Sequence, residues 1–168
     1  MSHNVTNIET FWVELPLREV PARHMVREIP HWNLFEIVKV TLDSGVVGFG
    51  ETMVYYTWGD ETTSEASKAR VLGKHPAENM WDDQLGAGLQ IALFDAAAKA
   101  ADCPLWQLLG QQVRDRCHIS WWDIDLSAED WISEAKLAAE NGYTAFKTKG
   151  RPWWDLIKNT RELCASLP

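Results

Sequence analysis

Hydrophobic and polar residues alternate in three segments of the first third of the chain, as they do in half-buried β-strands. Residues 4–17 alternate until Pro16 ends the run, and residues 33–42 alternate again. The turn-forming sequence Asp-Ser-Gly at 43–45 then leads into a second β-branched run at 46–51, which predicts a hairpin. The pattern therefore predicts a three-stranded antiparallel sheet.

Two stretches of this region have no such period. Residues 18–32 mix prolines, arginines and histidines, so we expect a long loop of the kind that is usually functional or mobile. Residues 52–60 include Tyr55 and Trp58 and are expected to form a second, aromatic loop, for which a simple surface turn is an equally good interpretation.

Helical patterns follow the sheet. Residues 62–73 begin with capping hydroxyls and end at a glycine, and a shorter helix is expected over 76–81. Residues 85–101 form the clearest helix, with an apolar stripe and many alanines that favour close packing. Asp95 lies inside this helix, and we expect a structural carboxylate with hydrogen-bond partners. A further helical turn is predicted over 104–110.

The second part of the chain alternates strands and helices. The pattern predicts a strand over 118–124, then a helix that Ser127 caps. It predicts a second strand over 143–149 and a second helix over 152–167. Short connections between such elements indicate parallel strands joined by right-handed crossovers. This order is typical of a (β/α) barrel or of a doubly wound sheet.

Two lysines stand at the far end of the run from Tyr143 to Lys149. Successive side chains of a strand project to opposite faces, so Lys147 and Lys149 are expected to point the same way. Neighbouring ammonium groups disfavour each other's charge, which makes one lysine available as a general base. A lysine pair taken alone is more often a solvated strand end, but the carboxyl end of a parallel strand is where such folds carry catalytic groups.

Composition narrows the class of protein. The chain has 168 residues, 46% of them hydrophobic, and a net charge of −8, which argues against a basic nucleic-acid-binding surface. Three scattered cysteines read as reduced thiols, and neither a signal peptide nor a membrane-spanning run is found, so a cytoplasmic location is expected. Of the ten tryptophans, we expect Trp81, Trp106 and Trp131 in the core.

Three stretches together resemble the enolase superfamily, in its mandelate racemase and muconate-lactonising branch. They are VVGFGE at 46–51, IALFD at 91–95 leading to PLWQLLG at 104–110, and FKTKG at 146–150. The resemblance spans nearly the whole chain. It implies an α+β capping domain over residues 1–112, with a three-stranded antiparallel sheet and helices, and then the first two β/α units of a TIM-like barrel over residues 113–168.

The resemblance also implies roles for individual residues. Lys149 is expected to abstract a proton alpha to a carboxylate, and Lys147 to tune this base and contact the substrate. The two irregular stretches correspond to capping-domain loops that close over such a site and select the substrate. Candidate residues for this closure are Arg23, His24, Arg27, Tyr55 and Trp58.

The cofactor expected for the full-length family is Mg²⁺, which supplies Lewis-acid charge to the carboxylate and so makes the alpha proton removable. Its three carboxylate ligands belong to the third, fourth and fifth barrel strands, and the sequence stops at Pro168, before the third. No metal ligand is therefore expected in this chain, which we predict to be truncated and catalytically incomplete. The remaining barrel is expected to have been lost, to come from a separate polypeptide, or to be missing from this sequence.

Two functional hypotheses follow. The first is a part of a magnesium-dependent racemase or acid-sugar dehydratase that acts on a small alpha-hydroxy or sugar acid, as a homo-oligomer or with a complementary barrel segment. The second is a non-catalytic relative that serves as an assembly or binding module. A doubly wound nucleotide-binding domain is disfavoured, because neither candidate parallel strand is followed by a glycine-rich phosphate loop. No nucleic-acid or membrane partner is expected.

Overall fold

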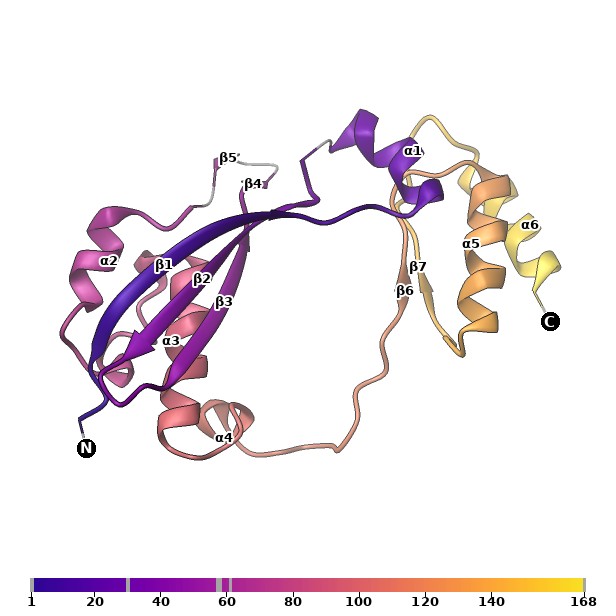
Figure 1. The fold of residues 1–168 in the computed structure, drawn as a ribbon. Coiled ribbons are helices and arrows are strands. Elements are labelled where there is room, and N and C mark those ends of the chain that lie inside the picture. Colours follow the sequence, from indigo (N-terminus) through magenta and orange to yellow (C-terminus); the bar gives the residue numbers. More distant parts are fainter. Residues whose placement is uncertain (1, 30, 57–58, 61, 168) are drawn as a thin grey trace. The chain divides into compact units, whose positions relative to one another are not determined.

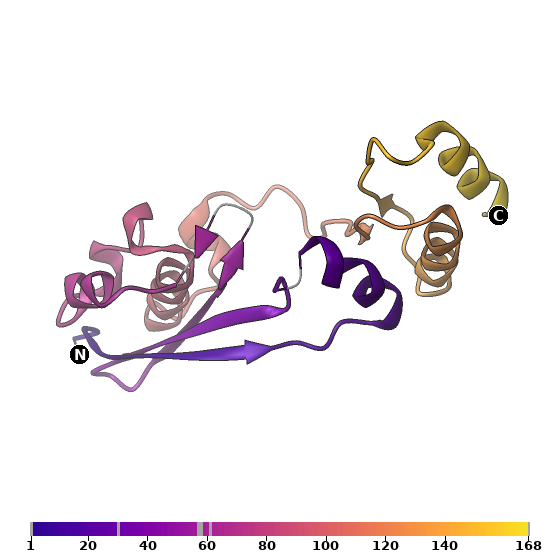
Figure 2. The same cartoon turned by 90° about the horizontal axis from the view of Figure 1, so that it is seen from above.

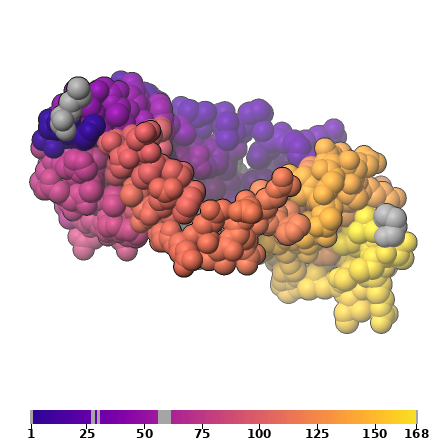
Figure 3. Space-filling view, turned by 90° about the horizontal axis from the view of Figure 1, so that it is seen from below, coloured from indigo at the N-terminus to yellow at the C-terminus, as the bar shows by residue number. Residues whose placement is uncertain are grey.

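A computed structural model of the chain describes residues 2–29, 31–56, 59–60 and 62–167 (Figure 1). The described residues divide into two compact units. The first lies within Met1–Leu15 and His31–Val113, and the second within Pro16–Pro30 and Arg114–Pro168. The stretch from residue 111 to residue 120, where the first unit gives way to the second, is exposed along its whole length (Figure 3).

The first unit contains the predicted antiparallel sheet. Its strands are β1 (Val5–Glu14), β2 (Leu34–Leu42) and β3 (Val47–Met53), in the order β1-β2-β3 with both pairs antiparallel. Gly45 turns the β2–β3 hairpin at a positive φ of 85°, a backbone conformation that glycine adopts without strain. The prediction of the sheet is confirmed, because alternation and turn residues are both local signals.

Helices cover one face of this sheet. Helix α3 (Ala87–Ala100) runs along β2 and β3 (Figures 1 and 2), and the shared core contains Val38, Val40, Leu89 and Leu93, all fully buried. The shorter elements of this unit are β4 (Tyr55–Tyr56), β5 (Gly59–Asp60), α2 (Glu65–Val71), η1 (Pro76–Glu78), η2 (Asp83–Leu85) and α4 (Trp106–Leu109).

Asp95 has the structural role predicted for it. Its Oδ2 accepts hydrogen bonds from the backbone N–H of Phe49 at 2.8 Å and from Lys99 Nζ at 2.7 Å, so the carboxylate ties α3 to β3. The prediction for the tryptophans is correct only for Trp131, which is 2% exposed. Trp81 and Trp106 are 62% and 44% exposed, because Trp81 lies in a turn after η1 and Trp106 begins the four-residue helix α4, in which no residue is buried.

Glycines allow β3 to approach α3 closely. A Cβ atom on Gly50 would lie 2.0 Å from the carbonyl oxygen of Gly88, and one on Gly48 would lie 2.3 Å from the carbonyl oxygen of Ala92. Both obstacles are backbone atoms, so the clash can be relieved only by moving the helix away from the sheet.

Replacing Gly50 by alanine is therefore expected to lower the free energy of unfolding of the first unit by about 3 kcal/mol. Urea unfolding followed by circular dichroism measures this change. The matched control is Glu51→Ala, since Glu51 is the next residue of β3 and is exposed; its expected effect is within about 0.5 kcal/mol. A Gly50→Ala variant as stable as Glu51→Ala would contradict the close approach.

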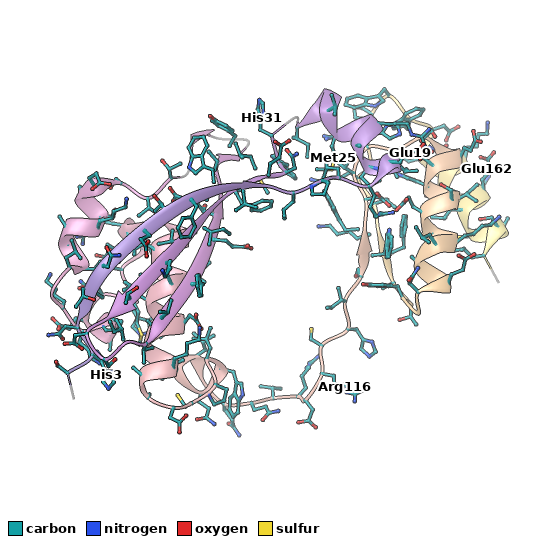
Figure 4. All side chains as sticks on the ribbon, in the orientation of Figure 1. His3, Glu19, Met25, His31, Arg116 and Glu162 are labelled. Atoms are coloured by element: carbon teal, nitrogen blue, oxygen red, sulfur yellow. The ribbon has the colours of Figure 1, made fainter. Side chains whose placement is uncertain are left out.

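The expected long loop at 18–32 is wrong. Residues Glu19–Glu28 form helix α1, from which Glu19 and Met25 project, and Met25 is 5% exposed (Figure 4). Pro21 lies in the first turn, where a helix tolerates a missing N–H, so it marks the start of the helix and does not break it. The side-chain hydrogen bonds that hold α1 involve residues more than 100 positions away in the sequence, and no local pattern predicts them.

The second unit has the predicted strand–helix order. Strands β6 (Trp121–Trp122) and β7 (Phe146–Lys147) pair in parallel, each followed by a helix, α5 (Ala128–Glu140) and α6 (Leu156–Ser166), and the two helices pack together (Figure 1). Ser127 caps α5 by accepting a hydrogen bond from the N–H of Asp130 at 3.2 Å, as predicted. Within the described residues, none of the helices is long and apolar enough to cross a bilayer.

Candidate active site at the ends of two parallel strands

The lysine pair lies where β7 ends. Lys147 is the last residue of the strand and Lys149 follows it by two positions, and both side chains are exposed. In the parallel ladder Lys147 is the partner of Trp122, and Phe146 is the partner of Trp121. Paired residues project to the same face of a sheet, and adjacent residues to opposite faces. Trp121 Nε1 donates a hydrogen bond to Glu134 of α5 at 2.9 Å, so Trp121 projects toward α5. Its neighbour Trp122 therefore projects to the opposite face, and so does Lys147, the partner of Trp122.

The backbone of this lysine strand is fixed by the neighbouring strand. The N–H of Trp121 donates to the carbonyl oxygen of Ala145 at 2.9 Å, and the N–H of Asp123 donates to the carbonyl oxygen of Lys147 at 3.0 Å. The ladder ends at Lys147, so strand alternation fixes the direction of Lys147 but not that of Lys149. The predicted convergence of the two ammonium groups stays a prediction.

A buried acidic pair lies on the α5 side of β6. Asp123 and Glu134 are 1% and 2% exposed. Both oxygens of Glu134 accept hydrogen bonds from the Arg18 guanidinium, at 2.9 and 2.5 Å, and this guanidinium also stacks over the Trp121 ring at 4.7 Å. The cluster of Arg18, Trp121, Asp123 and Glu134 therefore joins the segment that leads into α1 to both β6 and α5.

The pKa values of the two acids in this cluster are shifted in opposite directions. Burial, reinforced by the nearby Glu134 carboxylate, raises the pKa of Asp123 from 3.8 to about 7. Burial alone would also raise the pKa of Glu134, but the hydrogen bonds from Arg18 and Trp121 outweigh it and hold this pKa below its ordinary value. The hydrogen bond to Glu134 in turn raises the pKa of Arg18. Asp123 is thus the acid of the cluster that holds its proton up to about pH 7.

Sequence reasoning did not find this acidic pair, although one signal was present. Glu134 stands at the third position after Trp131 and just before Ala135, on the stripe of α5 that is otherwise apolar and buried. A charged residue in an apolar stripe needs a partner. That partner is Arg18, which lies 116 positions away in the sequence, so it could not be predicted from the residues around Glu134.

The predicted loop residues are divided between the two units. Arg23 Nη2 and His24 Nε2 both contact Asp130 in the first turn of α5, at 3.0 and 2.8 Å, and Arg27 belongs to the same helix α1. Tyr55 belongs to β4 of the first unit, and its ring lies 5.2 Å from that of His31. Trp58 lies outside the described residues. The role predicted for these residues, closure over a bound substrate, stays a prediction.

The carboxylates near the lysine strand do not fit a magnesium site. Asp125 is fully buried and accepts a hydrogen bond from Trp154 Nε1 at 2.6 Å, and Asp123 is buried beside Glu134. Magnesium requires several oxygen ligands around an open position that keeps water. Across the part of the chain that the structure describes, no three histidine, cysteine, aspartate or glutamate side chains gather as metal ligands.

Comparison with solved structures identifies the fold. The chain superposes on 2-chloromuconate cycloisomerase from Rhodococcus opacus 1CP with a TM-score of 0.73 and 24% identity, covering 99% of this chain and 48% of that one. This chain shares the fold of mandelate racemase and muconate-lactonising enzymes. A mandelate racemase/muconate lactonizing protein from Herpetosiphon aurantiacus gives a TM-score of 0.77 at 19% identity, with 99% and 50% of the two chains covered.

An epimerase has the same fold. The L-Ala-D/L-Glu epimerase from Bacillus subtilis matches with a TM-score of 0.71 and 23% identity, over 97% of this chain and 50% of that one. No family model matches the sequence. The predicted fold, an α+β capping domain followed by the start of a (β/α) barrel, is confirmed, and the chain spans about half the length of the structures that it matches.

Proposed function

We propose that the complete gene product is an enzyme of the enolase superfamily in which Lys149 removes the proton alpha to the carboxylate of a small acid. The observation that carries this proposal is the lysine pair at the carboxyl end of β7, beside the parallel strand β6. The fold shared with a cycloisomerase and an epimerase supports it.

The chemistry follows from the position of the lysines. The carboxyl ends of parallel strands are the edge at which barrel folds present catalytic groups, and both lysines are exposed at that edge. A lysine acts as a base only in its neutral form, and a neighbouring ammonium favours that form. In this proposal Lys149 accepts the alpha proton, and Lys147, two residues earlier, contacts the substrate carboxylate.

Magnesium dependence is proposed for the complete gene product and not for this chain. The described residues do not fit the metal, so its ligands belong to other barrel strands, in the same polypeptide or in an associated one. The proposed substrate is an alpha-hydroxy acid or a sugar acid. Racemisation or dehydration then depends on the group that faces the lysines from across the barrel.

Hydrogen–deuterium exchange tests the proposal. The complete gene product is incubated in D₂O with magnesium and a panel of alpha-hydroxy and sugar acids, and loss of the alpha-proton signal is followed by NMR. We expect exchange with at least one acid and its loss on adding EDTA. If no acid of the panel exchanges, the enzymatic function is wrong, and the non-catalytic binding module becomes the better explanation.

A further inference from the structure

The connection between β7 and α6 carries Lys149 and is held in place at its start and at its end. At its start, the N–H of Asp123 binds the carbonyl oxygen of Lys147 at 3.0 Å. At its end, Asp155 caps α6 by accepting a hydrogen bond from the N–H of Lys158 at 3.0 Å. Between these points, a Cβ atom on Gly150 would lie 3.0 Å from Leu156 Cδ1, so the connection folds closely onto the first turn of α6.

Asp125 binds this connection from the segment that follows the neighbouring strand β6. It lies between β6 and α5, it is fully buried, and the flanking residues Ile124 and Leu126 are also buried, which fixes its backbone. Its Oδ1 accepts a hydrogen bond of 2.6 Å from the indole N–H of Trp154, a residue of the β7–α6 connection. Burial strengthens such a hydrogen bond, because the local dielectric constant is low.

The two anchors come from one short stretch. The backbone N–H of Asp123 binds Lys147, two residues before Lys149, and the side chain of Asp125, two residues after Asp123, binds Trp154. Lys149 lies between these two attachment points. A segment fixed at both ends to the same buried stretch has few conformations available to it, which is what a catalytic base on a connection needs.

We infer that Asp125, through its hydrogen bond to Trp154, is a positioning residue that orients the connection bearing Lys149. This inference rests on the proposed function, because it assigns Asp125 to the same site. Asp125 is fully buried, so its proposed role is to fix the position of Lys149 and not to contact the substrate. A base displaced by about 1 Å loses about a hundredfold in rate.

The variant that tests this inference is Trp154→Phe in the complete gene product, which keeps a ring and removes the N–H donor. We expect the rate constant of alpha-proton exchange to fall about ten- to hundredfold, with KM changed less than about threefold. Asp125→Asn keeps an acceptor oxygen and is expected to retain more of the rate than Trp154→Phe does. The matched control is Trp153→Phe, because Trp153 is on the same connection and is 56% exposed.

A second readout does not depend on activity. Labelling with an amine reagent, followed by mass spectrometry, compares Lys149 with Lys147 in the 168-residue chain, and we expect Trp154→Phe to change their ratio. The indole N–H of Trp154 in the wild-type chain is expected to exchange with solvent more slowly than that of Trp153, a measurement that stands even if the variant fails to fold.

The possible failures are distinguishable. If Lys149→Ala retains exchange, the proposed function is wrong, and the positioning role falls with it. If Lys149→Ala abolishes exchange while Trp154→Phe matches wild type in rate and labelling, only the positioning role is overturned. An equal loss in Trp153→Phe, or an unprotected Trp154 indole, would also overturn it.

Discussion

Replacing Lys149 by alanine is expected to lower the turnover number of the complete gene product by about a thousandfold or more, because the variant lacks the proposed base, which follows β7 by two positions. Lys147→Ala is expected to have a smaller effect on turnover and to raise KM, since this residue is proposed to contact the substrate carboxylate. Steady-state kinetics on the acid found by deuterium exchange measures both effects.

The matched control for these two variants is Lys136→Ala. Lys136 is an exposed lysine on α5, away from the strand end, and its loss removes the same charge from the chain. We expect Lys136→Ala to keep wild-type kinetics. Equal losses in Lys136→Ala and Lys149→Ala would show that net charge matters and not a base at this position.

Stability of the second unit is expected to fall as the pH rises from about 4 to about 7, because of Asp123. Its pKa is raised from 3.8 to about 7 in the folded state, mainly by burial, so between these values the folded chain holds a proton that the unfolded chain releases. The free energy of unfolding therefore decreases with pH across this window. A shift of this size corresponds to about 4 kcal/mol, at 1.36 kcal/mol per pKa unit.

Asp123→Asn removes this dependence. The amide is neutral like the protonated acid, so the variant is expected to match wild type near pH 4 and to be more stable by up to about 4 kcal/mol at pH 8. Urea unfolding at pH 4.5, 6 and 8 measures the difference. The control is Glu129→Gln, an exposed acid in the first turn of α5. Parallel pH profiles of wild type and Asp123→Asn would show that Asp123 is ionised throughout.

The antiparallel sheet and the principal helices could be predicted from the sequence because their signals are local. The β2–β3 hairpin follows from alternation on both sides of a turn, and α5 follows from Ser127 and an apolar stripe. Strands β6 and β7 were predicted in the right places but too long. Each pairs with the other over two residues.

The features that the sequence did not reveal depend on contacts between distant residues. Helix α1 is held by ion pairs from Arg18 to Glu134 and from Arg23 to Asp130, and by the contact between His24 and Asp130. Its composition alone resembles that of a loop. The raised pKa of Asp123 likewise arises from burial against an element that follows it in the chain.

The candidate site was predicted in part. The lysines could be found because their spacing and their place after a β-prone run are properties of the sequence. Their surroundings could not, because the hydrogen bond from Trp154 to Asp125 joins two connections that are separated by a helix and a strand. A strand prediction places a side chain on a face, whereas packing between connections decides how firmly that side chain is held there.

Deuterium incorporation at the alpha carbon, compared for wild type and Lys149→Ala with the same acid, measures the proposed proton abstraction most directly. The complete gene product is expected to exchange the alpha proton for deuterium, and the variant is expected to show no exchange above the rate in buffer. Exchange by Lys149→Ala at the wild-type rate would contradict the role of Lys149 as the base.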